Sequence, residues 1–472
     1  MTESAITTGL ASYVERGSYS RLPPNAVEAA RQVILDCFGA MIAGAGEPAS
    51  RIVASLGATG NGSGRCSLIG YEYTSGAAEA GLVNGVSAHV LELDDTHHPG
   101  LLHPSAVLLP TILAIGEEVE ASGRDLITAY LYGLDVMSAL ANGLNPRHYA
   151  LGWHATGTLG PLFAAAAAAK LLDLDSEGIA TALSIAASEA GGIRRNFGSM
   201  TKALHAGLAV QSGITAARLA ERGFTAGAAV LEGERGFFDL MAGEGGWTPD
   251  RFLAPLDHKF KLSISGLAIK RFASCGATHP PIEAALLLRQ ALETRLEEVA
   301  EIEAVVNPMV GNVLIHHNPT TGAEGKFSLE HSLAVALVDG EAGLPQFTDA
   351  RVNDPKVRSI ASRVRTLFDP AIGLAAQMSW GARVTIRLSS GRIESRVVDV
   401  ARGKWLGARL TDEEIRQKFL GCLAFANVER HVAEDLANEL SHIEQAPSVG
   451  ALLAPLRRRS AAIELSSLAR VR

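Results

Sequence analysis

Apolar residues recur at helical spacing through most of the first 260 positions and divide this part of the chain into successive helices. A Pro-Pro-Asn start signal precedes the first long one, at residues 26–44. The same spacing predicts helices at 77–91, 105–119, 125–143, 158–172, 177–190 and 203–222. The 158–172 segment holds six consecutive alanines and is apolar on all sides, which is typical of a buried helix. The first half is therefore predicted to be entirely helical.

The pattern changes near residues 266–282. Residues 301–306 alternate as a strand does, and 383–388 with 392–398 around Ser-Ser-Gly predict a β-hairpin. Helices are expected between them at 280–295 and 328–340, and a capping box at Thr411 opens a helical tail over 411–457. We therefore predict a mainly α fold. An all-helical domain is formed by both chain ends, 1–265 and 401–472, with an α+β domain inserted at 266–400.

One polar stretch, residues 92–105, interrupts the apolar helices of the first half. It contains two hydroxyls, Thr96 and Ser105, and six acids and histidines: Glu92, Asp94, Asp95, His97, His98 and His103. Ionisable groups are costly inside a protein unless they are paired. Polar loops carried on a rigid scaffold are where binding and catalytic groups gather. We therefore expect this stretch to form the centre of a site.

Composition excludes several classes of partner. The 472-residue chain has a net charge of −8 and no basic cluster, which argues against nucleic acid. Its longest apolar run, 159–169, is too short for a membrane span of about 20 residues, and the N-terminus lacks the features of a signal peptide. Four widely spaced cysteines are typical of reduced thiols. We expect a cytoplasmic protein.

Four further stretches combine ionisable groups with small residues. They contain His154 (152–158), Arg195 and Lys202 (194–205), Lys270 and His279 (270–281), and His331 (325–332). Each stretch alone also reads as a capped or solvated turn. Lys202, however, falls in the first turn of a predicted helix, where a cation opposes the helix dipole unless an anion is bound.

Two other chemistries fit parts of these stretches. Cys275 with His279 suggests a thiol nucleophile, although no third member of a triad is evident. His97, His98 and His103 with the neighbouring acids offer zinc ligands, but without the regular spacing of known zinc motifs. We therefore predict neither a metal nor a thiol mechanism.

The candidate residues together favour acid–base chemistry on a carboxylate. The chain lacks a P-loop and a dinucleotide-binding fingerprint. Lys202, Lys270 and Arg195 would bind carboxylates and stabilise negative charge that develops beside one of them. His103, His154 or the Asp94–Asp95 pair would move a proton. This combination predicts proton abstraction next to a carboxylate, followed by loss of water, loss of CO2 or reprotonation.

The same residues carry a resemblance to the MmgE/PrpD family, which includes 2-methylcitrate dehydratase, cis-aconitate decarboxylase and iminodisuccinate epimerase. The resemblance extends over nearly the whole chain. It rests on five ordered motifs: His89-Val-Leu-Glu-Leu-Asp-Asp-Thr96 with His103-Pro-Ser105, Gly152-Trp-His-Ala-Thr-Gly-Thr-Leu-Gly160, Asn196-Phe-Gly-Ser-Met-Thr-Lys202 with His205-Ala-Gly207, Ser274-Cys-Gly-Ala-Thr-His-Pro280, and Lys326-Phe-Ser-Leu329.

The resemblance implies a homodimer that uses no cofactor, with its site between the helical domain and a lid-like α+β domain. It places the site residues at Asp94 or Glu92, Thr96, His103, His154, Lys202, Lys270 and His279. We therefore expect a lyase or isomerase of a small di- or tricarboxylate. A carboxylate-binding protein without activity is the alternative from a different class.

The chain departs from the family pattern at two positions. Glu92 stands where many members have aspartate, and His331 stands where decarboxylase-like members tend to carry tyrosine. The segment from Thr96 to His103, with the motifs around His154 and Phe197, resembles the epimerase-like branch more than the dehydratase. Glu92 and His331 are expected, with Thr96 and Arg195, to contact substrate.

Overall fold

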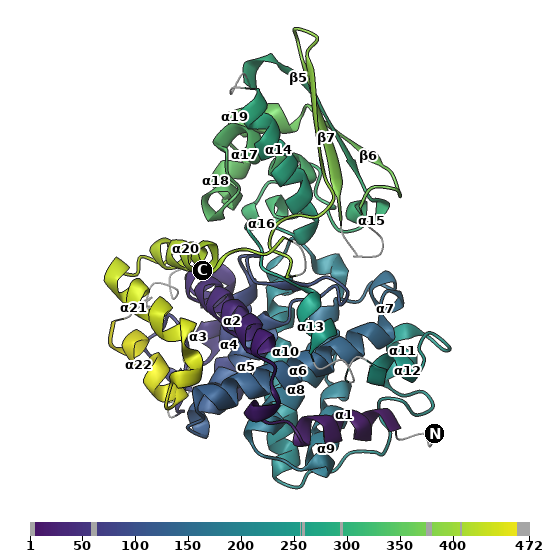
Figure 1. Cartoon of the computed structure of the whole chain (residues 1–472), viewed down its shortest axis with the longest axis vertical. Coiled ribbons are helices and arrows are strands. Elements are labelled where there is room, and N and C mark those ends of the chain that lie inside the picture. Colours follow the sequence, from purple (N-terminus) through teal and green to yellow (C-terminus); the bar gives the residue numbers. More distant parts are fainter. Residues whose placement is uncertain are drawn as a thin grey trace.

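The computed structural model describes residues 5–57, 64–254, 256, 260–292, 296–373, 380–405 and 408–459 (Figure 1). Thirteen helices of the first part lie within these ranges, and the predicted ones are confirmed with small shifts at their ends. They are α1 (Ala5–Glu15), α2 (Pro24–Gly44), α3 (Pro48–Gly57), α4 (Ala77–His89), α5 (Ser105–Glu118), α6 (Gly123–Leu144), α7 (Arg147–Ala150), α8 (Ala155–Leu171), α9 (Ser176–Ser188), α10 (Met200–Glu221), α11 (Phe237–Ala242), α12 (Asp250–Leu253) and α13 (Lys261–Ser265).

The alanine-rich helix α8 lies at the centre of this helical body. Its residues 155–169 are buried, and it packs against α5, α6, α9 and α10. Small side chains also let α4 and α10 cross closely. A Cβ atom added to Gly207 would lie 2.4 Å from the Leu82 carbonyl oxygen, and one added to Gly85 would lie 2.8 Å from the Gly207 Cα atom. Glycine at both positions therefore sets the distance between these two helices.

The second body, drawn in green at the top of Figure 1, contains a four-stranded sheet with helices over one face. The strand order is β6-β5-β7-β8, with β5 parallel to β6 and both other pairs antiparallel. The predicted strand and hairpin are confirmed as β5 (Val299–Val306), β7 (Ala382–Leu388) and β8 (Ile393–Val398). The short, partly exposed β6 (Val364–Phe368) was not predicted. The helices are α14 (His279–Ala291), α15 (Pro308–Gly311), α16 (Gly322–Gly325), α17 (Leu329–Asp339), α18 (Asp349–Val352) and α19 (Pro355–Ala361).

The helical tail is confirmed as α20 (Asp412–Phe425), α21 (Arg430–Ser441) and α22 (Val449–Arg459). The predicted capping box at Thr411 and Glu414 is present. Helices α20 and α21 pack on α2, and α22 packs on α5, so the chain returns to the helices from its beginning (Figure 1). The fold is mainly helical, as predicted.

The prediction that the first half is entirely helical is wrong in detail. Strand β1 (Cys66–Ser67) pairs with β2 (Thr74–Ser75), and β3 (Thr96–His97) pairs with β4 (Leu267–Ala268). Two-residue strands are too short to produce an alternating pattern in sequence. The β3–β4 pair has a structural effect, because it ties the polar stretch to the segment that leads into the second body.

The two connections between the bodies lie side by side. The Ile269 amide donates to the Gly403 carbonyl (2.9 Å), and the Trp405 amide donates to the Leu267 carbonyl (2.8 Å). The outgoing segment after β4 is therefore paired with the returning segment after β8.

None of the helices in the described ranges is both long and apolar enough to cross a lipid bilayer. The four cysteines are free thiols, with Cys275 partly exposed and the other three buried.

Candidate active site

The close crossing of α4 and α10 brings His89, the last residue of α4, to Lys202 in the first turn of α10. The Lys202 Nζ atom lies 2.8 Å from His89 Nε2. Both side chains are buried, and the Lys202 ammonium also lies over the rings of Phe197 and Phe327, at 5.2 and 5.4 Å from their centroids. The Lys202 cation, which opposes the dipole of α10, is thus buried, and its contacts with specific partners offset this unfavourable position.

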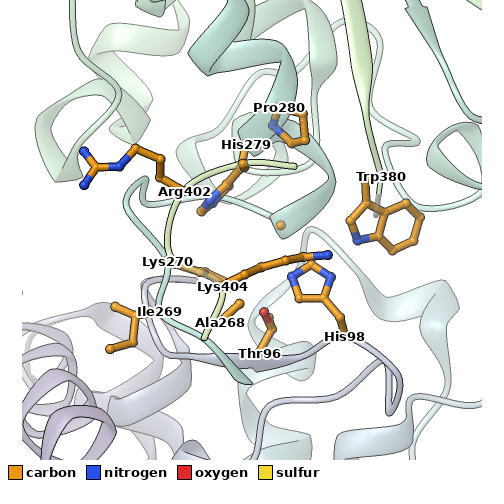
Figure 2. A pocket seen from close by; sticks show the side chains of 12 residues that line it. Thr96, His98, Ala268, Ile269, Lys270, His279, Pro280, Trp380, Arg402 and Lys404 are labelled. Atoms are coloured by element: carbon orange, nitrogen blue, oxygen red, sulfur yellow. The ribbon is translucent and has the colours of Figure 1, made fainter. Parts of the chain in front are cut away.

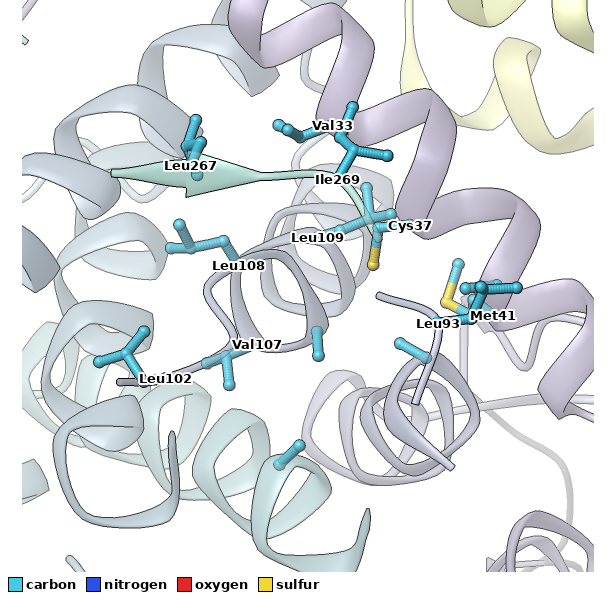
Figure 3. Close-up of a cluster of buried hydrophobic side chains, with 14 of the residues drawn as sticks. Val33, Cys37, Met41, Leu93, Leu102, Val107, Leu108, Leu109, Leu267 and Ile269 are labelled. Carbon is cyan, nitrogen blue, oxygen red and sulfur yellow. The ribbon is translucent and has the colours of Figure 1, made fainter. Parts of the chain in front are cut away.

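Apolar residues within the polar stretch hold it against the core. Leu93 and Leu102 are buried, and Figure 3 shows Leu93 beside Met41 of α2 and Leu102 near Val107 of α5. Lys418 of α20 adds a polar anchor, because its Nζ atom donates to the Leu93 carbonyl (2.7 Å). The stretch is therefore part of the packed interior, which fixes the directions of its charged side chains.

The Glu92 carboxylate joins the two principal lysines. It forms ion pairs with Lys202 and with Lys270, the latter with Oε2 3.2 Å from the ammonium. Burial opposes ionisation of Glu92, but the two lysines outweigh it and hold the pKa of this carboxyl below its usual range. Glu92 also has a positive φ of 54°, a conformation that residues other than glycine adopt less readily. Glu92, which stands where many family members have the shorter aspartate, thus lies between the two lysines that were expected to bind substrate carboxylates.

The two lysines respond differently to this environment. Burial lowers the pKa of Lys202, and Glu92 only partly compensates. Burial also disfavours the Lys270 cation, but Glu92 and Asp94 outweigh it and raise the pKa of that ammonium. Lys270 is held further by the Glu92 carbonyl, to which its Nζ donates over 3.0 Å. Lys270 is therefore the more firmly charged of the two.

Asp94 organises two histidines through one oxygen. Its Oδ2 atom lies 2.9 Å from His89 Nδ1 and 3.1 Å from His103 Nδ1. Burial opposes ionisation of Asp94, but the two histidines and Lys270 outweigh it and hold the pKa of Asp94 well below its usual range. Because a carboxylate only accepts, both Nδ1 atoms carry the hydrogen and donate. His89 then accepts from Lys202 at Nε2.

His103 Nε2 forms no hydrogen bond with the described residues, so its lone pair is available. The Nδ1 hydrogen of His103 is directed at two acceptors, the Asp94 carboxylate and the Asp95 carbonyl, the latter at 3.1 Å. Burial is the main cause that lowers the pKa of His103 to about 3, with Asp94 opposing and the lysines adding to the shift. The ring is therefore neutral near pH 7, and its Nε2 atom is suited to accept a proton.

His154 is a third histidine of the site and lies against His89. The two rings stack with centroids 5.9 Å apart, and Phe197 meets His154 edge-on at 5.0 Å. Burial, followed by the charge of Lys202, lowers the pKa of His154 well below its ordinary value. His154 is the N-cap residue of α8, which begins three residues before the predicted start, and its side chain makes no cap hydrogen bond.

The ionisable residues described so far form one buried acid–base cluster, which contains His89, Glu92, Asp94, His103, His154, Lys202 and Lys270. A large cleft reaches this cluster from one side. Its empty volume is about 1470 Å³, part of it open to solvent. One wall comes from α3, α4 and α10 of the helical body, and the other from residues 321–327 and 344–349 of the second body. His89, Glu92, Lys202 and Lys326 line it. Lys326 is buried and donates to the Val90 carbonyl (3.1 Å), so a second lysine joins Lys202 on the cleft lining.

Thr96 and His279 line a smaller pocket on the other side of Lys270 (Figure 2). It lies where the connections between the bodies meet and has an empty volume of about 340 Å³. Burial, followed by the charge of Lys270, lowers the pKa of His279 to about 3. Lys270 thus lines the smaller pocket, and its ammonium is directed at Glu92, which lines the large cleft.

Two predicted substrate-binding residues lie away from the cleft lining. Arg195 is exposed, while its neighbour Arg194 packs over the Tyr149 ring at 4.0 Å. His331 is buried behind the cleft wall, with Nε2 2.9 Å from the Gln346 carbonyl and its ring against Phe347. Neither side chain contacts the lysine cluster in the described part of the chain.

Asp95 holds the start of α5. Its Oδ1 atom accepts from the Ser105 amide at the start of α5 (3.1 Å). Burial, followed by the charge of Asp94, raises the pKa of Asp95 to about 8. A neutral carboxyl group there is compatible with its apolar surroundings.

The donor atoms do not favour a divalent metal ion. His89, Asp94 and His103 each place one possible ligand atom within 4.8 Å of the others. However, the Asp94 oxygen already accepts from both Nδ1 atoms, His89 accepts from Lys202, and Lys270 lies 3.9 Å from Asp94 Oδ1. The ammonium groups of Lys202 and Lys270 already place two positive charges here, and their repulsion opposes a third. His97 does not join this group, since its Nδ1 atom accepts from the Gly100 amide.

Two residues of the cluster and the cleft lining were not among the predicted site residues. His89 and Lys326 both stand inside the motifs that carry the family resemblance, and that is the signal by which they could have been found. Periodicity alone places His89 at the end of a helix and Lys326 in a turn, and it gives no reason to bring them together.

The fold and the cluster define a mainly helical protein with a buried acid–base site of histidines, lysines and carboxylates. The chain belongs to the MmgE/PrpD family. Residues 8–250 match the MmgE/PrpD N-terminal domain, and residues 272–442 match the MmgE/PrpD C-terminal domain. This membership supports an enzyme of the MmgE/PrpD type and, at the level of the family, a lyase.

Curated relatives match over most of their length. A human cis-aconitate decarboxylase is 28% identical over 433 residues, which are 89% of this chain and 88% of that protein. The mouse cis-aconitate decarboxylase is 27% identical, with 93% and 90% covered. A cis-aconitate decarboxylase of Aspergillus terreus is 26% identical, with 88% and 89% covered.

Proposed function

We propose that the protein is a cofactor-independent lyase or isomerase that transfers a proton at the carbon next to a carboxylate of a small di- or tricarboxylate. The observation that carries the proposal is the orientation of His103. Its Nδ1 hydrogen is committed to Asp94, so a neutral imidazole keeps its Nε2 lone pair within the electrostatic influence of Lys202 and Lys270. A base next to fixed cations is the arrangement that proton abstraction beside a carboxylate requires.

The steps follow from the charges of the cluster. Substrate carboxylates bind Lys202, Lys270 and Lys326, and part of the Glu92 interaction is exchanged for them. His103 removes the proton, and the electron pair moves into the carboxylate held by the lysines. The hydroxyl on the neighbouring carbon then leaves as water with the proton that His103 has accepted, or a second acid protonates the carbon on its other face while His103 keeps its proton until product leaves. Loss of CO2 instead requires the reverse transfer, in which a neutral imidazole bearing hydrogen on Nε2 protonates carbon.

Two features support a decarboxylase as the first activity to test. Three relatives that match nearly the whole chain are cis-aconitate decarboxylases by name. The cleft lining also includes Lys202 and Lys326, and Glu92 on the same lining pairs with Lys270, so three ammonium groups in or next to the cleft suit a substrate with three carboxylates. Epimerase-like and dehydratase-like reactions use the same groups and remain within the proposal.

The proposal includes three statements about the whole molecule. Residues 266–400 close over the cleft as a lid, because the cleft has walls from both bodies. Two chains of 49.5 kDa form a homodimer, which light scattering would measure as about twice that mass. The enzyme works in the cytoplasm, consistent with its four free thiols.

The test is an NMR screen in D2O with 2-methylcitrate, citrate, cis-aconitate and iminodisuccinate. It monitors both product and deuterium uptake next to each carboxylate. We expect turnover or exchange with at least one acid. If an acid raises the melting temperature but is neither converted nor exchanged, the protein is a carboxylate-binding protein instead.

The variant His103→Asn tests the assigned base. An asparagine amide can still donate to Asp94 but has no counterpart of Nε2, so turnover should fall by at least about 100-fold. His317→Asn is the matched control, because His317 is exposed and pairs with Glu330 on the surface. Near-wild-type turnover of His103→Asn would remove His103 from the role of base.

A further inference from the structure

A second histidine lies directly behind His154. His205 is on α10, one turn after Lys202, and its Nδ1 atom is 3.0 Å from Nδ1 of His154. The two rings are tilted, with centroids 5.2 Å apart. On its other side, His154 stacks on His89 of the cluster. His154 is therefore placed between the acid–base cluster and His205.

Backbone glycines hold the His205 ring in place. A Cβ atom added to Gly157 would lie 3.1 Å from His205 Cβ, and one added to Gly192 would lie 3.3 Å from His205 Cγ. Gly192 also accepts a hydrogen bond from the His154 amide (3.0 Å). The same backbone segment thus positions both histidines, and the contact between them is a built feature of the fold.

The Nδ1–Nδ1 hydrogen bond links the tautomers of the two rings. One Nδ1 must donate and the other must accept. When His205 donates, the hydrogen of neutral His154 is on Nε2, and His154 can act as an acid. When His154 donates, its Nε2 atom has the lone pair and can act as a base. That Nε2 atom is buried and has no hydrogen-bond partner among the described residues.

We propose that His205 is a positioning residue that sets the tautomer of His154 and relays its proton. A proton taken up at His154 Nε2 is balanced by transfer of the Nδ1 proton of His154 to Nδ1 of His205. His205 then releases the proton on its own Nε2 atom to water, since 7% of this residue remains exposed. One proton enters, one crosses and one leaves, so both rings end neutral.

Neutral rings fit the surroundings of the pair. Burial, followed by the charge of Lys202, lowers the pKa of His205 to about 4, and the same causes lower the pKa of His154 well below its ordinary value. A stable imidazolium is therefore disfavoured at either position, and a concerted exchange avoids forming one. The inference rests on the proposed function only in that the proton entering at His154 comes from, or goes to, the substrate.

The first experiment needs no substrate. Ring-¹⁵N-labelled histidine in the whole protein reports which nitrogen of His154 carries hydrogen, with the His154→Asn spectrum used for assignment. We expect the His154 shifts to change in His205→Phe, which preserves ring volume but removes the hydrogen bond. Unchanged His154 shifts in a folded His205→Phe protein would overturn the inference, even if every carboxylate proves inert.

The second experiment uses any substrate that the wild type converts. In His205→Ala, turnover should fall by at least about tenfold with KM changed by less than about twofold, and added imidazole should restore part of the loss. His205→Asn, which can fill only one hydrogen-bonding role at a time, should be impaired without unfolding. In the control His317→Ala, turnover should equal that of the wild type, and added imidazole should not change it. Wild-type turnover in His205→Ala, or a loss that imidazole leaves untouched, would contradict the relay.

Discussion

Replacing Glu92 by glutamine should destabilise the free protein and strengthen its response to carboxylates. The substitution keeps the shape of the side chain but removes the charge between Lys202 and Lys270. At 3.2 Å and an effective dielectric constant of about 20, the attraction to Lys270 alone is about 5 kcal/mol. Loss of one partner of a buried pair typically costs about 3–5 kcal/mol. We expect a fall in Tm of the order of 5 °C.

Thermal unfolding with and without citrate measures both effects. Citrate should raise the Tm of Glu92→Gln by more than it raises that of the wild type, because a citrate carboxylate supplies the negative charge that the two lysines have lost. Glu118→Gln is the control, since Glu118 pairs with Arg218 near the surface and its loss should cost less than about 1 kcal/mol. If Glu92→Gln matches the wild type in both Tm and citrate response, Glu92 does not neutralise the lysines.

Three further predictions concern other parts of the site. The raised pKa of Asp95 makes a contribution to stability that is full below the ordinary aspartate range and falls as pH rises to about 8, so the Tm of Asp95→Asn should gain on that of the wild type between pH 6 and pH 9. An equal Tm difference at both pH values would contradict this. Gly207→Ala should push α10 from α4 and lower both Tm and turnover, whereas Gly421→Ala, where a Cβ meets open space, should lower neither. If Gly207→Ala retains full turnover, the crossing distance is not critical. Finally, prolonged EDTA treatment should leave turnover unchanged, and a loss restored by added Zn²⁺ would assign a metal to His89, Asp94 and His103.

The sequence predicted the location of the cluster better than its connections. The polar stretch between two apolar helices could be recognised because ionisable groups are rare inside such patterns. Its packing could not, because Leu93 and Leu102 are ordinary apolar residues until α2 and α5 are placed beside them. The departure at Glu92 was visible in sequence, but its contact with two lysines from distant segments was not.

Distances between helices account for most of what the sequence missed. His89 reaches Lys202 because two glycines let α4 and α10 cross closely, and periodicity within either helix contains no such information. The choice between Arg194 and Arg195 depends on the rotation of a single short turn. The neutral state of Asp95 depends on Asp94 and on complete burial, which a list of acidic residues does not reveal.

The paired connections between the two bodies limit how the cleft can open. A single tether would allow the upper body to twist and swing freely, but here the segments at Ile269 and Trp405 run together as a short hydrogen-bonded strip. Such a strip bends easily about one line and resists rotation about the others. Movement of the upper body would then follow an arc, so that Lys326 and Phe327 leave the helical body together.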